Sequence, residues 1–372
     1  MLHIFNLILR QRYFLQIFFI ENENILEMNV YIRINSLAKK NHQNKRIMKE
    51  ESDIIFNFPS RNSEYSSIIV GIGGGASRIV DQMRKRCFPD VGLYAFGMNR
   101  KEMNELSLYN KYLIGQEGLG SGKNRFLAEY ECNNSLPVIE NILKNKLITV
   151  FVVCLGGGTG EGCIRSFLGK AKEMQSRAII LVATIPHSSE GKEKRKNALG
   201  LLKALEPMVD GLHIVDYDDF QCNTFTELFQ KADRKIIQFT DAFVGMVLRY
   251  CLISFDFNDL RAFLEYPTPS KNINFFTLTG SVDFLRSELL EEWCKKLPAK
   301  YSSVDDVAMI IFAIEFTDWL DDSEEATELM NVINDFMQQI SAGTEVKSGI
   351  YIDETIPSHQ YRINIFTKCR RQ

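Results

Sequence analysis

The sequence predicts an α/β fold in which a doubly wound, mostly parallel sheet is joined by a long central helix to a smaller α+β domain. Apolar runs alternate with segments of helical spacing from Ser67 to Val215, the pattern of parallel strands joined by crossover helices. A long segment without proline then carries apolar residues at three- and four-residue steps, as a buried helix does. Strand and helix patterns resume after residue 272, which indicates a second domain.

Buried strands are expected before the long helix, with helices between them. Each strand is a short aliphatic run next to glycine or to a helical segment, which is typical of a parallel sheet covered on both faces. The strands are expected at 68–70, Val91–Met98, Leu147–Leu155, Arg177–Ile185 and Gly211–Val215. The helices are expected at Ala76–Arg86, Leu136–Asn145, a segment that ends at Met174, and Asn197–Met208.

The long helix is expected to span Thr226–Tyr250 and to measure about 37 Å at 1.5 Å per residue. Its apolar face is broad, so we expect it to lie buried between the two domains. Pro267–Asn272 has the composition of a linker. The second domain is expected to have strands at Ile273–Gly280, Ala308–Phe316, Glu345–Asp353 and Gln360–Thr367 and helices at Ser281–Leu297 and Ser323–Gln338.

These patterns divide the chain into segments with different expected structure. They are an N-terminal extension at 1–60, a first domain at 61–225, the central helix at 226–250, a loop and linker at 251–271, and an α+β domain at 272–372. The extension is expected to be disordered, to lie weakly on a membrane surface, or to precede a true start at Met28 or Met48. Its apolar part is interrupted by arginines and is far shorter than the ~20 residues needed to span a bilayer.

The bulk composition excludes several classes of function. The chain has 372 residues, with 45% hydrophobic and 24% charged residues, as expected of a globular protein with a large core. Its formal net charge of -3 provides no basic field for nucleic acid. Scattered cysteines without a CxxC pair and scattered histidines predict neither a disulfide framework nor a metal site. Reduced thiols in a cytoplasmic protein are therefore expected.

Two glycine clusters indicate a site for phosphate groups. Gly71–Ser77 (GIGGGAS) and Gly156–Gly162 (GGGTGEG) each follow a predicted strand and open a predicted helix. Glycine lets backbone N–H groups approach a phosphate closely, and the N-terminus of a helix favours negative charge. Two such loops on parallel strands predict a nucleotide whose phosphate chain is held from both sides. A third cluster, Gly115–Gly122, is expected either to close over the phosphates or to be a surface loop.

The P-loop and the NAD(P)-binding fold are two other classes of nucleotide site with glycine-rich loops. Neither loop ends in the G-K-[ST] sequence of a P-loop, so that class is excluded. The first loop alone also fits the G-x-G-x-x-A pattern of an NAD(P)-binding fold. That fold needs an acidic ribose ligand where this chain has Asn99, Arg100 and Lys101, and it gives the second loop no role. An NAD(P)-dependent oxidoreductase is therefore a remote alternative.

Several motifs, in the same order, resemble those of FtsZ, the tubulin-like GTPase family of bacterial cell division. They are Val70–Met83 (VGIGGGASRIVDQM), Gly118–Gly122 (GLGSG), Gly156–Gly162 (GGGTGEG), Pro186–Lys192 (PHSSEGK), Phe229–Asp233 (FQKAD) and Ser254–Asp259 (SFDFND). The third motif is similar to the tubulin signature loop GGGTGTG. The resemblance covers residues 68–368 and implies a divergent member of the family, with GTP and Mg²⁺ as ligands.

The resemblance implies a role for each residue that matches a motif. Contacts on the phosphate side are implied for Gly73, Gly74, Gly75, Ala76, Ser77, Arg78, Gly118, Gly120, Gly122, Gly157, Gly158, Thr159, Gly160, Glu161 and Gly162. Glu190 would bind the ribose, beside Lys194 and Arg195. Phe229 would stack on the base. Asp233 would accept hydrogen bonds from N1–H and the exocyclic amine of guanine, and because adenine has no hydrogen at N1 this carboxylate selects GTP over ATP.

Four positions depart from the family's motifs. Arg78 replaces an Asn, Lys101 stands where an Asp near the γ-phosphate and Mg²⁺ is expected, Glu161 replaces a small Thr, and Ser254 replaces an Asn. Glu161 is expected to put a negative charge beside the phosphates, which the charges of Arg78 and Lys101 would partly offset. We expect these changes to affect GTP hydrolysis more than GTP binding.

Asp256 and Asp259 are the implied catalytic carboxylates. Asp233 and Asp256 lie near opposite ends of the predicted helix, about 30 Å or more apart, so Asp256 cannot reach the γ-phosphate of its own chain. Both carboxylates would instead act on the next chain, in a head-to-tail filament whose contact does not close. An Asp-x-x-Asp pair after a helix is also typical of a helix cap, which is the alternative interpretation.

The expected function is that of a cytoplasmic GTP-binding, filament-forming cell-division protein that acts at the division site and hydrolyses GTP between its own subunits. The alternative is a slow or inactive accessory that binds GTP and co-assembles with a standard FtsZ. The chain ends at Gln372, directly after the last predicted strand, so tail-dependent membrane tethers are not expected as partners. Nucleic acid and a transmembrane segment are not expected either.

Overall fold

The computed structural model describes residues 14–20, 28–35, 53–58, 65–85, 90–249, 251–253, 255–281, 306–317, 331, 334, 343–353, 355–357 and 360–370. The chain divides into two units, Met1–Glu64 and Tyr65–Gln372. In the first unit, β1 (Phe14–Ile20), β2 (Met28–Asn35) and β3 (Asp53–Phe58) form an antiparallel sheet in that order. Within the extension predicted at 1–60, the described residues form these three strands. Aliphatic residues alternate with other types in β2, a pattern typical of a strand.

The second unit contains a parallel six-stranded sheet that confirms the predicted doubly wound topology. Its order is β6-β5-β4-β7-β8-β9, so the chain runs outward from β4, returns to β7 beside β4, and then runs outward on the other side. The direction of winding reverses between β4 and β7, which is where ligands bind in open α/β sheets. The strands are β4 (Ser67–Ile72), β5 (Val91–Gly97), β6 (Asn110–Leu113), β7 (Ile148–Cys154), β8 (Ala178–Ile185) and β9 (Gly211–Asp216).

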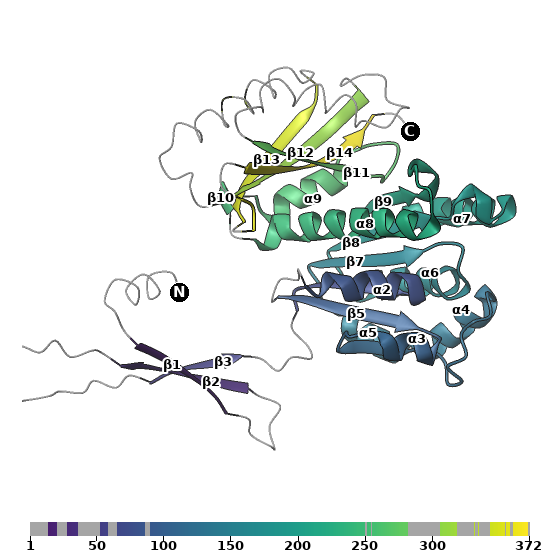
Figure 1. The fold of residues 1–372 in the computed structure, drawn as a ribbon, viewed down its shortest axis with the longest axis horizontal. Helices are drawn as coiled ribbons and strands as arrows, with labels where there is room; N and C mark the ends of the chain where they lie inside the picture. Colours follow the sequence, from purple (N-terminus) through teal and green to yellow (C-terminus); the bar gives the residue numbers. More distant parts are fainter. Residues whose placement is uncertain are drawn as a thin grey trace, which may run out of the picture. The chain divides into compact units, whose positions relative to one another are not determined.

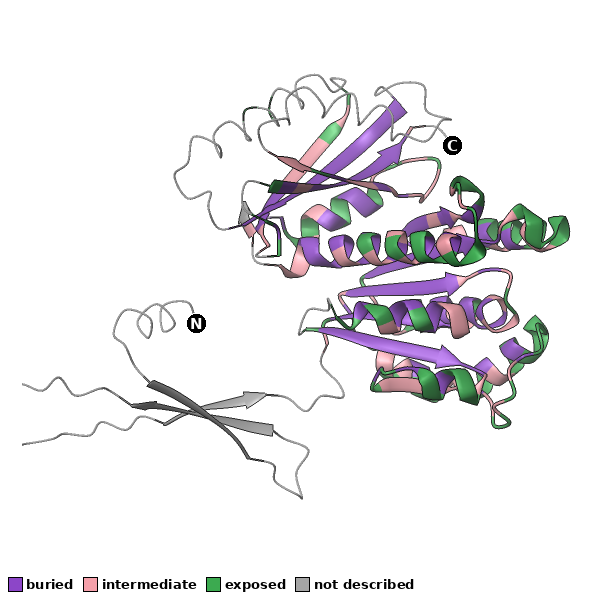
Figure 2. Cartoon of the chain, in the orientation of Figure 1, coloured by how far each residue is buried: buried purple, intermediate pink, exposed green. Residues whose placement is uncertain are grey.

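Helices cover both faces of this sheet (Figure 1). One face packs against α2 (Gly74–Met83), α3 (Arg100–Glu105) and α8 (Phe225–Leu248). The other face packs against α4 (Arg125–Asn134), α5 (Leu136–Leu143), α6 (Gly158–Glu173) and α7 (Lys192–Leu205). Strands β4, β5 and β8 are buried along their length, whereas the helices have one buried and one exposed face (Figure 2).

Helices α3 and α4 were not predicted, because neither shows an apolar periodicity. α3 has only 6 residues. In α4 the large apolar side chains point outward, with Phe126 69% and Tyr130 65% exposed, while the buried residues are the small Ala128 and Cys132. These small residues let α4 pack closely on α6, where a side chain at Gly162 would collide with Ala128.

The long helix α8 lies between the six-stranded sheet and a second sheet (Figure 1). It begins after the N-cap Thr224, whose hydroxyl accepts the Glu227 N–H at 3.1 Å, and it runs for 24 residues. The Phe239 and Phe243 rings of α8 contact Phe366 of the second sheet, with centroids 5.9 and 5.8 Å apart. The same buried cluster includes strands of the six-stranded sheet, so α8 joins the two cores as predicted.

The second sheet has the order β10-β13-β12-β14-β11, with β12 and β13 parallel and the other neighbours antiparallel. Its elements, with the adjoining helix, are β10 (Cys251–Ile253), α9 (Phe257–Glu265), β11 (Asn274–Ser281), β12 (Val307–Phe316), β13 (Glu345–Ile352) and β14 (Gln360–Cys369). The helices expected at Ser281–Leu297 and Ser323–Gln338 lie almost wholly outside the described residues. Within the described ranges, no helix is both long and apolar enough to cross a membrane.

His213 on β9 is a buried titratable group at the contact between the two sheets and α8. Its ring stacks on Phe239 with centroids 4.0 Å apart, and its Nδ1 lies 2.9 Å from the Ile273 carbonyl oxygen. Burial is the main cause that lowers the pKa of His213 from 6.5 to about 3, against the opposing effect of that carbonyl. The neutral ring is therefore the folded form.

Acid is expected to destabilise the fold through His213. The unfolded chain takes up a proton below about pH 6.5 and the folded chain only near pH 3, so this stability is present above pH 6.5 and is lost as the pH falls towards 3. The loss is about 1.4 kcal/mol per pH unit from this group. His213→Gln should flatten that slope in urea unfolding curves measured across the range. His187→Asn, at a histidine whose side chain is 32% exposed, is the control, and equal slopes for both variants would contradict the assignment.

Candidate functional site

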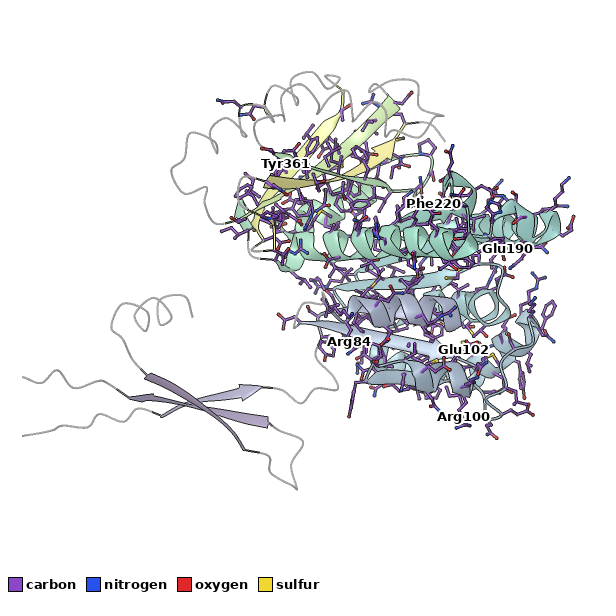
Figure 3. All side chains as sticks on the ribbon, in the orientation of Figure 1. Arg84, Arg100, Glu102, Glu190, Phe220 and Tyr361 are labelled. Carbon is purple, nitrogen blue, oxygen red and sulfur yellow. The ribbon has the colours of Figure 1, made fainter. Side chains whose placement is uncertain are left out.

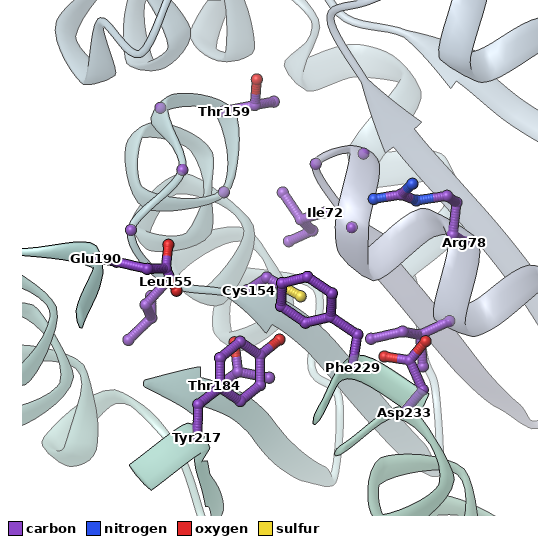
Figure 4. Close-up of a pocket in the computed structure, with 18 of the residues that line it drawn as sticks. Ile72, Arg78, Cys154, Leu155, Thr159, Thr184, Glu190, Tyr217, Phe229 and Asp233 are labelled. Carbon is purple, nitrogen blue, oxygen red and sulfur yellow. The ribbon is translucent and has the colours of Figure 1, made fainter. Parts of the chain in front are cut away.

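A cleft of about 580 Å³ lies where β4 and β7 end, at the reversal of the sheet topology. Its volume suits a small-molecule ligand such as a nucleotide. Both predicted glycine loops line it, one from each strand (Figure 4). The predicted residues that line the cleft are Gly73, Gly74, Gly75, Arg78, Gly157, Gly158, Thr159, Gly160, Glu190, Lys194, Phe229 and Asp233.

The backbone of the two loops is arranged to receive an anion. Gly73 has φ +89° and Gly156 has φ +90°, a region that other residues rarely adopt, so glycine is required at both positions. Helices α2 and α6 start within these loops, and neither N-cap, Gly73 or Gly157, makes a side-chain capping hydrogen bond. The first N–H groups of both helices are therefore available to an anion in the cleft, which the helix dipoles favour.

The opposite side of the cleft is formed by α8 (Figure 4). Phe229 is 42% exposed, and its ring contacts Tyr217 and Phe225, with centroids 5.6 and 6.2 Å apart. Gln82 of α2 donates from Nε2 to Asp233 Oδ2 at 3.2 Å. Burial raises the pKa of the Asp233 carboxyl, and the hydrogen bond from Gln82 and the charge of Arg78 oppose that rise. The cleft therefore places a stacking surface beside an oriented carboxyl group.

The floor of the cleft includes residues that the sequence did not single out. Cys154, Thr184 and Tyr217 lie between the two sides. Burial raises the pKa of the Cys154 thiol to about 11 and also raises that of the Tyr217 phenol. Both groups are neutral at physiological pH, so the floor adds no negative charge that would repel a phosphate.

Of the two predicted basic residues after β8, only Lys194 lines the cleft. Its Nζ pairs with Glu190 Oε2 at 2.5 Å, and Glu190 is labelled in Figure 3. Arg195 points elsewhere: its guanidinium donates to both oxygens of Asp216, at 2.7 and 2.5 Å, and pairs with Asp218 at 3.3 Å. Arg195, which was expected to bind the nucleotide, thus joins α7 to Asp216 at the end of β9 and to the Pro186 carbonyl, at 2.9 Å.

Four other residues predicted on the phosphate side do not line the cleft. They are Ala76, Ser77, Glu161 and Gly162. Ser77 is buried and its hydroxyl donates to the Gly71 carbonyl at 3.4 Å. Glu161 was expected to place its charge beside the phosphates, but its Oε1 turns back and accepts the Gly156 N–H at 2.6 Å. Its carboxylate thus braces the second loop and is absent from the residues that line the cleft.

The segment of the third glycine cluster, Gly115–Gly122, contacts the cleft through the residue that follows it, Lys123, and not through the predicted glycines. Gly118, Gly120 and Gly122 do not line it. The Gly118 carbonyl accepts the Arg100 N–H at 2.9 Å, and the Gly120 N–H donates to the Met98 carbonyl at 3.0 Å. Lys123 follows and does line the cleft. Its neighbour Ser121 lies 3.3 Å from the Thr159 hydroxyl, so this segment is joined to the second loop.

Lys101 does not line the cleft, but its neighbour Glu102 brings a carboxylate to the first loop. A Cβ at Gly74 would lie only 2.0 Å from Glu102 Oε2, and Asn99 Nδ2 donates to Glu102 Oε1 at 3.3 Å. Figure 3 labels Glu102 and its neighbour Arg100, both of α3. In the described part of the chain no three His, Cys, Asp or Glu residues are grouped to hold a metal ion. Glu102 therefore places a carboxylate next to the first loop, although it does not itself line the cleft.

Asp256 and Asp259 lie beyond the far end of α8 and do not line the cleft. At 1.5 Å per residue, α8 alone measures about 36 Å. Asp256 caps α9: its Oδ1 accepts the N–H groups of Asn258 at 2.8 Å and of Asp259 at 3.1 Å. Asp259 Oδ2 accepts the Asp256 N–H at 3.2 Å, which completes a capping box. The alternative interpretation as a helix cap thus describes both residues within one chain, and Ser254 lies outside the described residues.

The sequence of this chain is similar to known proteins over the part that forms the cleft. Residues 66–223 match the family described as the Tubulin/FtsZ family, GTPase domain. Cell division protein FtsZ of Aquifex aeolicus is 29% identical over 205 residues, which cover 53% of this chain and 56% of that protein. Cell division protein FtsZ 1 of Pyrococcus abyssi is 28% identical over 206 residues, covering 53% and 55%. The chain thus spans about half the length of the curated relatives it matches.

Solved structures show that the likeness in fold extends further than the likeness in sequence. The empty FtsZ dimer of M. jannaschii has a TM-score of 0.69 at 20% identity, over 82% of this chain and 89% of that one. CetZ2 from Haloferax volcanii, in a GTPγS-bound protofilament, has a TM-score of 0.63 at 15% identity, over 81% and 92%. Residues 66–223 are therefore similar to the GTPase domain of the Tubulin/FtsZ family, and the chain shares its fold with FtsZ and CetZ2 over 82% and 81% of its length.

Proposed function

We propose that this chain binds GTP in the cleft and hydrolyses it where a second copy docks head to tail. The observation that carries the proposal is the placement of both glycine loops, Phe229 and Asp233 around one cleft of nucleotide size. The loops supply N–H groups and helix N-termini for the phosphates. Phe229 supplies a ring for stacking on the base, and Asp233 supplies acceptors for N1–H and the amine of guanine.

The proposed hydrolysis uses carboxylates from the neighbouring chain. Asp256 lies beyond the end of α8 that is opposite to Asp233, so it serves the cleft of another copy and not its own. There a carboxylate can orient the attacking water and accept its proton. The backbone N–H groups of both loops, with Lys123 and Lys194, would stabilise negative charge on the phosphates. Bound Mg²⁺ would neutralise further charge on the β- and γ-phosphates.

The relatives suggest that this chain assembles with other subunits and takes part in cell division. A contact between two different surfaces of one protein repeats without closing and forms a filament. The similar FtsZ structure is a dimer and the similar CetZ2 structure is a protofilament, while FtsZ of Aquifex aeolicus is a cell division protein. We infer that this chain assembles with itself or with a standard FtsZ at a cytoplasmic division site.

A second candidate function is that of a slow or inactive accessory that binds GTP and co-assembles. One observation favours it: both oxygens of Asp259 already carry hydrogen bonds within the chain, from Lys347 Nζ and from the Asp256 N–H. A carboxylate held in this way is a weak base. The NAD(P) alternative has no comparable support, because the second glycine loop and α8 line the same cleft as the first loop.

GTP turnover measured against protein concentration distinguishes these functions. Sedimentation with a slowly hydrolysed GTP analogue, run in parallel, reports assembly. Turnover per subunit that rises with concentration, together with pelleting, is expected for hydrolysis between subunits. Pelleting without turnover would establish the accessory, and turnover per subunit that is independent of concentration would contradict the shared site.

Removing the charge of Glu161 is expected to strengthen GTP binding. Glu161→Gln keeps an oxygen acceptor for the Gly156 N–H but removes a negative charge from the first turn of α6. We expect the affinity for GTP to rise up to about fivefold, most at low ionic strength. Glu173→Gln makes the same change at the far end of α6 and is the control in the fluorescence titration. Equal affinities for the two variants would show that the phosphates do not sense Glu161.

A further inference from the structure

The side chain of Asp259 is held from two directions. Lys347 on β13 donates from Nζ to Asp259 Oδ1 at 2.8 Å, with the two side chains 25% and 34% exposed. The Asp256 N–H donates to the other oxygen at 3.2 Å. Asp256 differs, since its Oδ1 carries both capping hydrogen bonds and its Oδ2 has no partner among the described residues. One carboxylate of the pair is fixed, and the other keeps an oxygen available.

The segment that carries these carboxylates is attached to β13 at two points. Strand β10, which follows α8, pairs with β13 through Cys251 and Tyr351. Lys347 lies farther along β13 and holds Asp259. The second sheet therefore sets the position of this segment, which the sequence alone could not indicate because Lys347 is 88 residues away from Asp259.

We propose that Lys347 is a positioning residue for hydrolysis: it holds Asp259 in place, so that the free oxygen of Asp256 meets the water in the next subunit's cleft. This inference rests on the proposed function. Asp259 acts through the capping box, in which its oxygen fixes the Asp256 backbone while Asp256 fixes the start of α9. Losing the ammonium group would loosen the box and move both carboxylates.

The charged and titratable groups around Asp259 predict how the pair responds to pH. Lys347, Glu345 and Tyr351 face this region from β13, and Asp256 faces it from the start of α9. Burial alone would raise the pKa of Asp259, but the hydrogen bonds from Lys347 and from the Asp256 N–H outweigh it and hold the pKa below its ordinary value. Without Lys347 the burial effect is opposed only by the Asp256 N–H.

Lys347→Met tests the inference, because it keeps most of the aliphatic stem and removes the ammonium group. In the full chain without nucleotide, carbon-13 NMR titration should show the pKa of Asp259 rising above its wild-type value. In GTP turnover, the acid limb of the kcat profile should move to higher pH by the same amount, with KM unchanged. Lys347→Arg should restore both, and Lys172→Met, which removes a lysine of α6, should change neither.

The two readouts separate failure of this inference from failure of the proposed function. An unchanged Asp259 pKa in Lys347→Met would overturn the positioning role, whatever the turnover. A shifted pKa with a kcat profile that is lowered equally at every pH would also overturn it, because the loss would then be structural. If the Asp259 pKa shifts in Lys347→Met but the wild-type chain pellets without GTP turnover, the proposed hydrolysis is overturned. The catalytic part of this inference then fails with it, while the ion pair between Lys347 and Asp259 is established.

Discussion

Asp256→Asn is expected to lower GTP turnover by about a hundredfold or more while leaving the affinity for GTP unchanged. The substitution removes the proposed base but preserves the fold, because Asn caps a helix about as well as Asp. The affinity should not change, since Asp256 lies away from the cleft of its own chain. Single-turnover hydrolysis at high protein concentration and GTP titration at low concentration measure the two quantities separately.

The choice of Asn over Ala follows from the observed cap. Asp256→Ala would also remove the acceptor of two backbone N–H groups, at a cost of about 1 kcal/mol in stability. A loss of turnover in the Ala variant alone would therefore report a damaged α9. A loss in both variants, with normal unfolding curves for Asn, would report the charge.

Mixing two inactive variants tests whether the site is shared. An Asp256→Asn chain keeps its cleft, and an Asp233→Ala chain keeps its carboxylate loop but binds GTP poorly. In a head-to-tail dimer the intact loop of the second meets the filled cleft of the first, so the mixture should regain turnover. A mixture as inactive as its parts, with both variants folded, would contradict hydrolysis between subunits.

Much of the fold could be predicted because its signals are local. The strands β4, β5, β7 and β8 are aliphatic runs that end at turns, and α8 carries a sustained helical periodicity. The elements that escaped prediction lack such signals. α3 and β6 are short, and α4 buries small residues while exposing its aromatic side chains. Packing against α6 stabilises α4, and a single sequence does not display that partner.

The site was predictable where backbone chemistry dictates residue type, and less so where side chains meet across the fold. Glycine loops at the ends of strands predict a phosphate site without any knowledge of the rest of the fold. The partner of Asp233, Gln82, lies 151 residues away, and Glu102 reaches Gly74 only because α3 packs near α2. Arg195 was predicted to bind the nucleotide because its charge fits such a site, and in the folded chain it pairs with Asp216, 21 residues away.

Asp233→Asn is expected to reverse the selectivity of the cleft between guanine and xanthine nucleotides. The Asp233 carboxylate can accept two hydrogen bonds from N1–H and the amine of guanine. Gln82 donates to Oδ2 in the wild type and would select the Asn rotamer whose oxygen takes that place. The Asn amide N–H₂ would then face the base. It repels the guanine amine but can donate to the carbonyl oxygen that xanthine carries at the same position.

The affinity for GTP should fall about a hundredfold or more in this variant, and the affinity for XTP should exceed it. Competition titrations of the full chain with GTP, XTP and ATP measure all three affinities under one condition. Asp219→Asn removes a carboxylate that does not line the cleft and should leave the order of affinities unchanged. An Asp233→Asn variant that still prefers GTP would show that the base lies elsewhere and would remove the reason for assigning guanine to this cleft. A reversed preference would place the base against α8 and, because the phosphates must then lie at the glycine loops, would fix the orientation of the whole nucleotide.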